Sequence, residues 1–275
     1  NVIQGEAKIT SPYTVEVNGK TLTTRNIVIA TGARPFVPPI KGIETIDYLT
    51  SDTLWELREQ PKRLIVLGGG PIGCELAQSF SRLGSHVTQV ESFERIMIRE
   101  DEDVSKLVQE RFEKEGVNVL TRHTAVEFIV ENGEKTLVCD NDGKLIRIPF
   151  DQVLIAVGRV ANVTGFGLEE LDIPTTNRRT VEVNEYLQTR FPNIYAAGDV
   201  AGPFQFTHTA AHQAWYAAVN ALFGKFKKFK ADYTIIPWAT FTEPEVARVG
   251  LNEQDAKEKG IAYEVTKFDV AELDR

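Results

Sequence analysis

The sequence has few cysteines. Only Cys74 and Cys139 occur, and neither belongs to a CxxC pair or a disulfide framework. This scarcity excludes a disulfide-stabilised secreted domain and favours reduced thiols inside the cell. No apolar stretch approaches the ~20 residues that span a bilayer, and the N-terminus lacks the basic and apolar regions of a signal peptide. We therefore expect a soluble cytoplasmic protein in which Cys74 is a small buried apolar side chain.

A basic surface is also missing. The formal net charge is -8, with 31 Lys and Arg against 39 Asp and Glu. Nucleic acid and anionic lipid both attract basic surfaces, so we expect neither nucleic acid nor membrane as a partner. One short run, residues 224–230 (GKFKKFK), is the exception. Such runs are usually exposed to solvent, and we predict a solvated connector there.

What the sequence does have is ordinary globular composition, with 42% hydrophobic and 25% charged residues, and a length that suits two domains. Residues 1–24 alternate over short stretches around Asn18-Gly19, which predicts a β-hairpin. The apolar run at residues 26–30 predicts a buried strand. Four prolines and glycines between residues 35 and 42 then indicate a stiff linker, so we place a boundary near residue 60.

From Lys62 onward, predicted strands and helices alternate. Buried strands are expected at residues 63–67, 86–90, 117–120 and 151–157, helices at 71–83 and 103–114, and a hairpin or three-stranded meander at 124–150. The apolar face of the first helix is predicted to comprise Ile72, Leu76, Phe80 and Leu83, with Gly84 ending the helix. This order of elements predicts an α/β fold with a doubly wound parallel sheet.

Residues 68–73 (GGGPIG) have GxGxxG spacing between a predicted buried strand and a predicted helix. In that context the pattern is typical of a dinucleotide site. Gly68 permits a tight turn, Gly70 lets a pyrophosphate approach the backbone, and Gly73 lets helix and strand pack closely. Pro71 and Ile72 open the helix, whose N-terminal N–H groups suit phosphate. The alternative is a glycine-rich turn without a ligand.

An acidic residue, Glu91, ends the next strand. A carboxylate at this position can accept hydrogen bonds from the adenosine ribose, and it repels a 2'-phosphate. We therefore predict NAD(H) rather than NADP(H), although the nearby Arg95 favours NADP(H). The alternative for Glu91 is a charge that is simply exposed at a strand end.

Five further blocks accompany the glycine motif. They are ATGARP at residues 30–35, QVESFERI at 89–96, VGR at 157–159, AAGDV at 196–200 and TFTEPEVARVGL at 240–251. In this order and spacing they resemble the class I pyridine-nucleotide disulfide oxidoreductases, of the dihydrolipoamide dehydrogenase and mercuric reductase type, over nearly the whole chain. The resemblance implies a doubly wound Rossmann-type NAD(H)-binding domain with a β-meander. It also implies a flanking partial FAD-binding domain and a partial α+β dimer-interface domain.

The resemblance also implies roles for individual residues. Asp199 resembles the aspartate that contacts the ribityl and pyrophosphate part of FAD, and Thr31 and Gly32 resemble a loop beside the flavin nucleotide. Thr209, Ala210 and Ala211 are expected to open a helix whose N-terminus faces the flavin. Gly158 is expected to contribute to the NAD site.

Candidate catalytic residues are few. Glu75 resembles a glutamate near the nicotinamide carboxamide, and an ordinary helix charge is the equal alternative. His208 and His212 are expected to pack or to form hydrogen bonds, with an acid–base role as the alternative. Trp215, Tyr216 and Trp238 are expected to be core or interface aromatics. No metal site is expected.

The sequence also departs from the family pattern. It lacks a first GxGxxG for FAD, a CxxxxC redox pair and a C-terminal histidine motif, and it begins at Asn1 without methionine. We therefore interpret the chain as truncated at both ends and expect it to hold FAD weakly and to be inactive alone. The expected parts are a partial FAD-binding domain at 1–60, an NAD(H)-binding domain at 61–160, a returning FAD-domain segment at 161–231 and a partial dimerisation domain at 232–275.

The function that the resemblance implies is FAD-dependent oxidation of NAD(P)H, with NADH preferred and a small-molecule or protein disulfide as acceptor, in a homodimer. A quinone, a metal ion or a small disulfide remain alternative acceptors. A non-catalytic NAD-binding fragment is the main alternative. A flavoprotein of ferredoxin-reductase type shares both nucleotide folds, but the block at 240–251 argues against it.

Overall fold

The computed structural model describes residues 1–269, so the last six residues of the predicted dimerisation segment lie outside the described part. The chain divides into two compact units. The first unit comprises residues 1–39, 49–57 and 155–236, and the second comprises residues 40–48, 58–154 and those from Pro237 onward. The backbone therefore passes between the units several times, and each unit is described by itself below.

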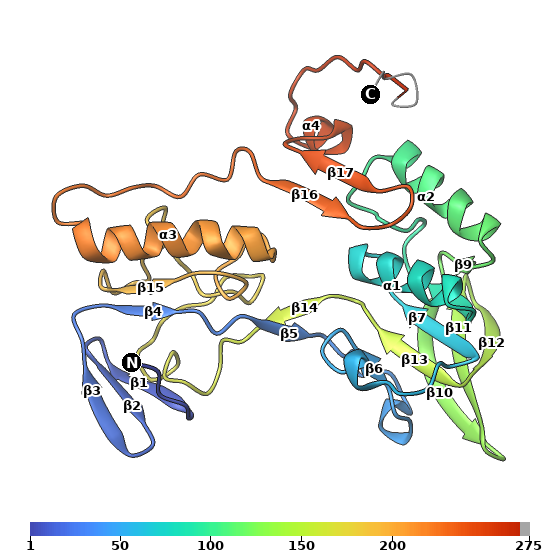
Figure 1. Cartoon of the computed structure of the whole chain (residues 1–275), viewed down its shortest axis with the longest axis horizontal. Coiled ribbons are helices and arrows are strands. Elements are labelled where there is room, and N and C mark those ends of the chain that lie inside the picture. The colour runs from blue at the N-terminus through green and yellow to red at the C-terminus, as the bar shows by residue number, and fades with distance from the viewer. Residues whose placement is uncertain (270–275) are drawn as a thin grey trace. The chain divides into compact units, whose positions relative to one another are not determined.

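The second unit contains a mixed α/β layer. Strands β13 (Gln152–Ile155), β7 (Arg63–Leu67), β8 (His86–Val90) and β9 (Asn118–Leu120) lie side by side in that order, and β7, β8 and β9 run parallel. Helix α1 (Pro71–Arg82) connects β7 to β8, and α2 (Glu102–Lys114) connects β8 to β9 (Figure 1). The residues of β7 are almost wholly buried from Leu64 to Leu67, which explains their uninterrupted apolar sequence. The parallel sheet with intervening helices confirms the predicted α/β class.

The buried face of α1 differs from the predicted one. The helix buries Gly73, Cys74, Ala77, Gln78 and Phe80, whereas Leu83 is 69% exposed. Small side chains face the sheet because α1 lies too close to β7 and β8 for large ones. The large apolar residues Ile72 and Leu76 are only half-buried beside that contact. Apolar periodicity alone therefore placed the centre of the helix face wrongly.

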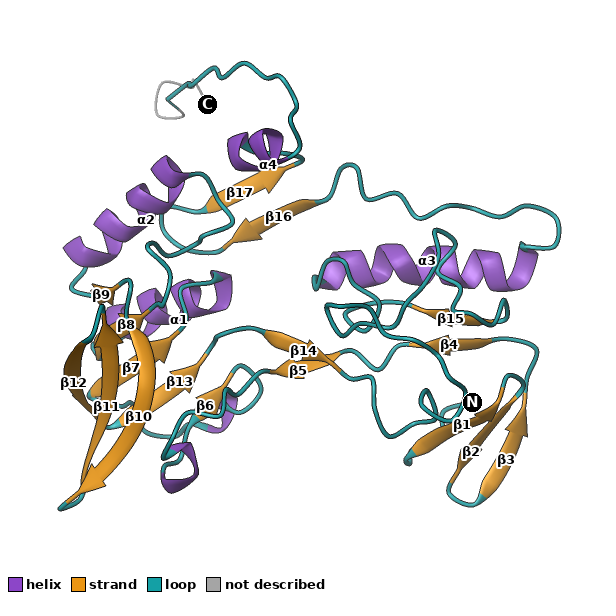
Figure 2. Ribbon diagram, turned by 180° about the vertical axis from the view of Figure 1, so that it is seen from behind, coloured by secondary structure: helices purple, strands orange, loops and turns teal. Residues whose placement is uncertain are grey.

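A three-stranded meander follows in the second unit. Its strands β10 (Thr124–Glu131), β11 (Glu134–Asn141) and β12 (Lys144–Phe150) pair antiparallel in sequence order (Figure 2). Phe128 and Phe150 meet edge to face with ring centroids 5.9 Å apart, and Leu137 is fully buried. Of the two interpretations of residues 124–150, the meander is the one that the structure adopts.

The second unit also includes the C-terminal elements. Strands β16 (Pro237–Thr240) and β17 (Val246–Val249) form a hairpin, and the short helix α4 (Glu253–Glu258) follows. The carboxylate of Asp101 accepts hydrogen bonds from the N–H groups of Glu253 and Gln254, at 3.2 and 3.1 Å. Asp101 stabilises the first turn of α4 in this way, and its side chain forms no capping bond with α2, which it precedes.

The first unit is built from short strands and one long helix. A hairpin with a third strand comprises β1 (Ala7–Ser11), β2 (Thr14–Val17) and β3 (Lys20–Thr23), and the turn at Asn18-Gly19 has positive φ at both residues. Strand β4 (Ile27–Ile29) pairs parallel with β15 (Ile194–Ala196), and α3 (Thr207–Phe223) covers that pair (Figures 1 and 2). The core beneath includes Ile29, Val181 and Ile194.

Two predictions for the first unit need adjustment. Val28 of β4 is 46% exposed, so the run at residues 26–30 alternates in burial and is not buried throughout. The predicted linker at residues 35–42 begins inside a strand, because Pro35 is the last residue of β5 (Ala33–Pro35), which pairs antiparallel with β14 (Arg159–Ala161). The remaining short elements are β6 (Leu49–Thr50) and the 3-10 turns Ile43–Thr45 and Leu54–Glu56. Within residues 1–269, none of the helices could cross a lipid bilayer, because each is too short or too polar.

Candidate functional site

The glycine-rich turn between β7 and α1 is closely packed on one side and open on the other. Gly68 has φ +117°, and its N–H donates to Val90 O at 2.8 Å. An added Cβ at Gly73 would lie far inside van der Waals contact with the carbonyl oxygen of Gly68, so only glycine lets the helix approach the strand here. A Cβ at Gly70 would meet nothing within 4 Å. Gly73 is therefore required for packing, while Gly70 faces open space.

The N-terminus of α1 lies directly behind this turn. Gly70 is the N-cap residue, Pro71 takes the first helical position, and no side chain caps the helix. The N–H groups of Ile72 and Gly73 therefore have no intrahelical partner. Free N–H groups and the positive end of the helix dipole at an open glycine turn fit a phosphate.

Glu91, at the end of β8, reaches the same turn. Its Oε2 accepts a hydrogen bond of 2.6 Å from the N–H of Gly69, and its Oε1 accepts from Phe93 N at 2.9 Å and Ser92 Oγ at 3.1 Å. A carboxylate offers about four acceptor positions, so one remains for a hydroxyl group. Gly69 is a candidate functional residue that the GxGxxG spacing does not single out, and a Cβ there would lie 2.9 Å from Glu91 Oε2. The three consecutive glycines at 68–70 were the sequence feature that could have identified Gly69 as part of the site.

A buried polar pair lies beneath the turn. Gln89 and Cys74 are fully buried, and Gln89 Nε2 donates to Gly68 O at 3.1 Å and contacts Cys74 Sγ at 3.5 Å. Gln89 Oε1 is buried without a hydrogen-bond partner. Burial raises the pKa of the Cys74 thiol to about 12, and burial does the same for Cys139. Both cysteines are unpaired, as predicted, and the thiol of Cys74 is inert because its thiolate is inaccessible.

The outer side of α1 binds the segment after β16. Glu75 Oε1 accepts from the backbone N–H of Phe241 at 2.9 Å. Gln78 forms two hydrogen bonds with the backbone of Glu243, at 2.8 Å through its Nε2 and at 2.7 Å through its Oε1. Glu75, the candidate catalytic residue, thus has a defined structural contact.

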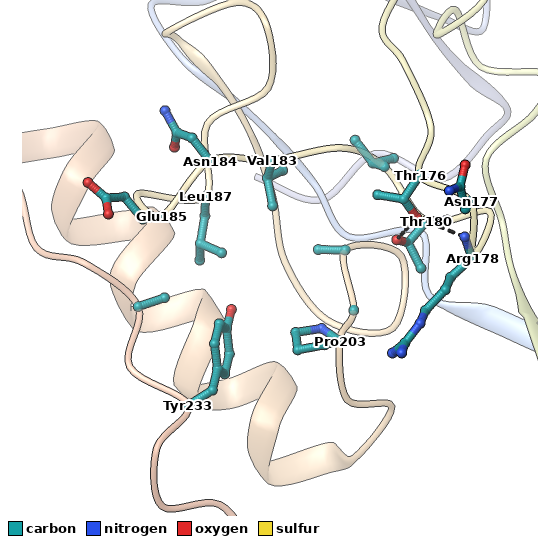
Figure 3. Close-up of a pocket in the computed structure, with 14 residues that line it drawn as sticks. Thr176, Asn177, Arg178, Thr180, Val183, Asn184, Glu185, Leu187, Pro203 and Tyr233 are labelled. Carbon is teal, nitrogen blue, oxygen red and sulfur yellow. Dashed lines mark hydrogen bonds between the residues drawn. The ribbon is translucent and has the colours of Figure 1, made fainter. Parts of the chain in front are cut away.

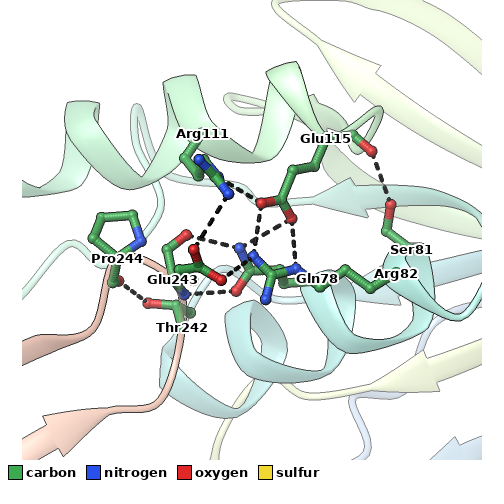
Figure 4. A network of polar contacts seen from close by, with 8 residues as sticks. All are labelled: Gln78, Ser81, Arg82, Arg111, Glu115, Thr242, Glu243 and Pro244. Atoms are coloured by element: carbon green, nitrogen blue, oxygen red, sulfur yellow. Dashed lines mark hydrogen bonds and ion pairs between the residues drawn. The ribbon is translucent and has the colours of Figure 1, made fainter.

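An ion-pair network extends this contact to α2 (Figure 4). Glu115 pairs with Arg82 at 2.7 Å and with Arg111 at 2.5 Å, and both arginines also contact the carboxylate of Glu243. Hydrogen bonding from Arg82, with help from Arg111 and Gln78, lowers the pKa of Glu115 to about 2. The network connects α1, α2 and the 242–244 segment.

The guanidinium of Arg95, which could favour NADP(H) by binding its 2'-phosphate, is occupied by other hydrogen bonds. Its Nη1 donates to the carbonyl oxygen of Glu100 at 2.7 Å, and its Nη2 donates to Gln254 Oε1 at 2.9 Å. A guanidinium committed to these groups must break hydrogen bonds before it can bind a 2'-phosphate.

In the first unit, Thr31 and Gly32 are fixed by residues that follow β14. Thr31 Oγ1 donates to the carbonyl oxygen of Asn162 at 2.7 Å, and Asn162 Nδ2 donates to Thr31 O at 2.9 Å. Gly32 has φ +66°, and a Cβ there would meet nothing within 4 Å. The loop therefore combines a fixed backbone with an open glycine.

Asp199 follows β15 and lies near Arg159. The Nε of Arg159 is 3.7 Å from Asp199 Oδ2, and its Nη2 donates to Ala33 O at 2.7 Å. Arg159 thus connects β5 to the Asp199 loop, and it is a further residue that the sequence analysis did not select as a site residue. Gly158, beside it, has φ +129° and accepts from Phe36 N at 2.9 Å.

Helix α3 begins at Thr207, two residues before the predicted start. Ala210 N–H donates to Phe206 O at 2.9 Å, so the free N–H groups of this helix end belong to Thr207, His208 and Thr209. The side chain of Thr209 is fully buried and its Oγ1 has no hydrogen-bond partner, while Ala211 is exposed. Thr209 contributes packing below the helix end.

Gln213 is the principal residue of this region that sequence reasoning missed. It is fully buried, its Oε1 accepts from Gly198 N at 2.6 Å, and its Nε2 donates to Gly202 O at 2.5 Å and to Tyr233 Oη at 2.9 Å. It thereby holds the loop that contains Asp199 against α3. His208 stacks on Phe206, and His212 Nε2 lies 2.8 Å from Asp232 O, which agrees with packing and hydrogen-bonding roles for both histidines.

The predicted residues therefore fall into two groups. Gly68, Gly70, Pro71, Ile72, Gly73, Glu75 and Glu91 lie in the second unit, whereas Thr31, Gly32, Gly158, Asp199, Thr209, Ala210 and Ala211 lie in the first. The structure brings the glycine turn, Glu91 and the start of α1 together in the second unit. No group of three acidic, histidine or cysteine residues suited to a metal occurs in the described part of the chain.

A cavity of about 490 Å³ in the first unit contains none of the predicted site residues (Figure 3). Its walls include Val183, Leu187, Pro203 and Tyr233, with Arg178 at one end. Burial raises the pKa of Tyr233, whose hydroxyl accepts the hydrogen bond from Gln213. The cavity therefore shares Gly202 and Tyr233 with the hydrogen bonds that Gln213 forms.

Comparison with known proteins gives consistent matches. Residues 1–214 match the family model described as pyridine nucleotide-disulphide oxidoreductase, and residues 236–275 match the dimerisation domain of the same family. A mercuric reductase of Staphylococcus aureus is 42% identical over 275 residues, which is 100% of this chain and 49% of that protein. A dihydrolipoyl dehydrogenase of Chlamydia pneumoniae is 35% identical and aligns with 97% of this chain and 57% of its own length.

The comparison with solved structures gives matches of the same kind. The HOCl-induced flavoprotein disulfide reductase RclA from Escherichia coli matches with a TM-score of 0.87 and 30% identity, covering 99% of this chain and 62% of that one. The chain therefore spans about half to three fifths of the length of the relatives it matches.

Proposed function

The chain belongs to the pyridine nucleotide-disulphide oxidoreductase family, and on that premise we propose that it carries the NADH-binding part of an FAD-dependent oxidoreductase. Members of this family depend on FAD and on NAD(P)H. We propose that the second unit contains a Rossmann-type domain at residues 61–160. Residues 1–60 and 161–231 then supply parts of the FAD-binding domain, and residues 232–275 supply part of a homodimer interface.

One observation carries the proposal for NADH. The uncapped N-terminus of α1 lies behind a turn in which Gly73 packs against Gly68 while Gly70 faces open space. Ile72 and Gly73 are proposed to donate N–H groups to the pyrophosphate, and Pro71 fixes the first turn of the helix that presents them. Glu91 is proposed to accept a hydrogen bond from an adenosine ribose hydroxyl through its remaining acceptor position.

The charge near Glu91 supports NADH over NADPH. A carboxylate repels a 2'-phosphate, and the guanidinium of Arg95 is committed to the carbonyl of Glu100 and to Gln254. To bind the 2'-phosphate of NADPH, the protein would have to overcome the repulsion from Glu91 and break the hydrogen bonds of Arg95.

Residues of the first unit fit the flavin. Gly32 offers an open, fixed backbone, Asp199 offers a carboxylate beside Arg159, and the end of α3 offers free N–H groups near Thr209. When bound, FAD supplies the capacity to take hydride from reduced nicotinamide and to transfer electrons to an acceptor. Thr31, Ala210 and Ala211 are proposed to shape the surface around it, and Gly158 to lie near the nicotinamide nucleotide.

Glu75 is proposed to orient the nicotinamide carboxamide. Its Oε2 has no protein partner among residues 1–269, whereas its Oε1 is held by Phe241 N–H. A carboxylate fixed through one oxygen can accept from an amide through the other. We propose a small-molecule or protein disulfide as the acceptor, which fits relatives named dihydrolipoyl dehydrogenase and glutathione reductase.

Absorbance spectroscopy and an NADH titration test the proposal. The full-length protein reconstituted with FAD should show flavin absorbance that NADH bleaches, and NADH should raise the thermal midpoint of the present chain even without flavin. Colourless protein that still binds NADH would instead support a bare nucleotide-binding module. An unchanged thermal midpoint and unchanged NADH fluorescence would contradict the nucleotide site itself.

A further inference from the structure

Residues 222–230, which we term the basic–aromatic turn, expose large apolar side chains beside lysines. Leu222 is 71% exposed, Phe223 56% and Phe226 91%. Lys225 and Lys227 are exposed on either side of Phe226. The predicted solvated connector accounts for the lysines, but not for a phenylalanine that is almost completely in water.

The backbone of this turn is fixed. The N–H groups of Phe226 and Lys227 donate to Phe223 O at 2.8 and 3.1 Å. The buried side chain of Asn220 then holds the other end, because it accepts from Phe229 N at 2.8 Å and donates to Phe229 O at 2.8 Å. The chain leaves α3 and doubles back along the helix at this point (Figure 1). Phe226 is therefore presented by a hydrogen-bonded turn.

The side chains of the turn separate into an inner and an outer set. Phe229 packs on Trp215 with ring centroids 5.7 Å apart, Lys228 lies 5.3 Å from the Tyr186 ring, and Lys230 pairs with Glu185 at 2.9 Å. Lys225 forms no ion pair or side-chain hydrogen bond with the described residues, and Lys227 Nζ lies 5.0 Å from the Phe229 ring. The inner residues anchor the turn on the first unit, which leaves Lys225, Phe226 and Lys227 outermost.

We propose that the basic–aromatic turn binds the surface of an anionic lipid bilayer. Phe226, with Phe223 and Leu222 beside it, inserts at the boundary between headgroups and acyl chains, where exposed apolar surface is removed from water. Lys225 and Lys227 then lie at the level of the lipid phosphates, and their long stems can reach the headgroups. This replaces our expectation that the protein has no membrane partner.

Charge complementarity identifies this partner. The chain carries a formal charge of -8, so an anionic leaflet repels the chain as a whole, whereas this turn carries four lysines within residues 225–230. Single-stranded nucleic acid would need aromatic rings lined up as stacking platforms along a basic groove. Here Phe226 stands between two lysines, Phe223 is exposed at the end of α3, and the ring of Phe229 packs on Trp215, so the rings do not follow one another along a basic groove. The arrangement fits a shallow wedge in lipid.

Vesicle co-sedimentation tests the proposal. The protein should sediment with vesicles of phosphatidylcholine mixed with phosphatidylglycerol, but not with phosphatidylcholine alone, and added salt should release it. Phe226→Ser should weaken partitioning about ten-fold. The double change Lys225→Gln with Lys227→Gln should weaken it about twenty-fold. Because these side chains are exposed, circular dichroism should show unaltered thermal unfolding.

Matched control variants make the outcome decisive. Leu145→Ser removes an exposed apolar side chain elsewhere, and Lys20→Gln with Lys144→Gln removes the same charge from two hairpin strands. Both controls should sediment as the unmodified protein does. The proposal is overturned by equal sedimentation of the Phe226 variant, by loss of binding in the controls, or by binding to single-stranded oligonucleotide with none to vesicles.

Discussion

The two units assemble their candidate sites in different ways. In the second unit the glycine turn, the start of α1 and Glu91 come from three adjoining segments of one β–α–β sequence, and the backbone itself supplies most of the donors. In the first unit the loop that contains Asp199 is positioned by distant side chains, chiefly Gln213 and Arg159. A site formed by local backbone can be recognised from a sequence motif. A site held by hydrogen bonds between residues distant in the sequence is recognised only from the three-dimensional structure. Mutations should therefore affect the two units through different physical causes.

Gly73→Ala should produce the largest effect and break the local arrangement of the second unit. The new Cβ would collide with the carbonyl oxygen of Gly68, forcing the helix from the strand. We expect a loss of about 3 kcal/mol in unfolding free energy and no measurable NADH binding. Urea unfolding and fluorescence titration measure both. Gly133→Ala, in an open meander turn with φ +81°, is the control and should cost only about 1 kcal/mol. Equal losses for the two variants would contradict the packing argument.

Gln213→Ala should damage the first unit instead. It would leave the buried backbone groups of Gly198 and Gly202 and the half-buried hydroxyl of Tyr233 without this partner, at a cost of about 3 kcal/mol in unfolding free energy. FAD binding should weaken with stability, while NADH affinity should stay unchanged. Gln205→Ala is the control, because that side chain forms no hydrogen bond with the described residues. Loss of NADH affinity in the Gln213 variant would abolish the distinction between the units.

Gly70→Ala sharpens the comparison by separating binding from packing. A Cβ at this position meets nothing in the protein, and φ is -77°, so the unfolding free energy should not change. The same Cβ would stand where the pyrophosphate is proposed to approach, and NADH affinity should fall about a hundred-fold. Calorimetric titration beside thermal unfolding gives both quantities. Unaltered affinity would mean that the nucleotide does not use the open side of the turn.

Acid should weaken the second unit through Glu115. Its folded pKa is about 2, against an ordinary value of 4.5, because Arg82 and Arg111 stabilise the carboxylate. The contribution is complete above the unfolded pKa and is lost as the pH falls from 4.5 towards 2, amounting to about 2 kcal/mol after solvent screening.

Unfolding free energy measured at decreasing pH should therefore fall less steeply in Glu115→Gln than in the unmodified protein. Glu113→Gln, on the same helix but outside the network, should leave the slope unchanged. Identical slopes for all three proteins would show that the network in Figure 4 does not contribute.

Glu91→Gln should have the smallest effect and should concern specificity. NADH affinity should fall about ten-fold, because a charged acceptor is replaced by a neutral amide. NADPH should no longer be repelled, so the ratio of the two dissociation constants should approach one. The neighbouring exposed Glu94→Gln is the control and should preserve the ratio. A Glu91 variant that still discriminates as strongly would assign the preference to other groups.

The sequence was most informative where structure is local. The hairpin at Asn18-Gly19, the alternation of strands and helices and the close approach at Gly73 were predicted from turn chemistry and periodicity, and the meander was one of two alternatives for residues 124–150. It failed for the buried face of α1, where tight packing selects small side chains and leaves Leu83 exposed. Periodicity identifies large apolar residues and so misses a helix that packs through alanine, glycine and cysteine.

Tertiary hydrogen bonds escaped the sequence for a related reason. Nothing near Gln213 in the chain indicates that it binds Gly198 and Gly202, which precede it by a loop. A weak signal was nevertheless present, since Thr209, Gln213 and Asn220 recur on one side of an otherwise apolar helix. Polar residues that recur on the buried side of a helix indicate that their side chains form hydrogen bonds with a neighbouring backbone segment. The residues expected to face the flavin were predicted from family resemblance alone, and these roles stay predictions.

The burial of both cysteines leaves the native protein without a thiol that reacts readily in solution. Cys74 and Cys139 both lie in the second unit, with thiol pKa values of about 12, so maleimide reagents at neutral pH should leave the native chain unlabelled. The reagent would modify these thiols only when the second unit opens, so the rate of modification measures the rate of opening. A single cysteine introduced on the surface of the first unit would consequently carry a fluorophore without any prior cysteine removal.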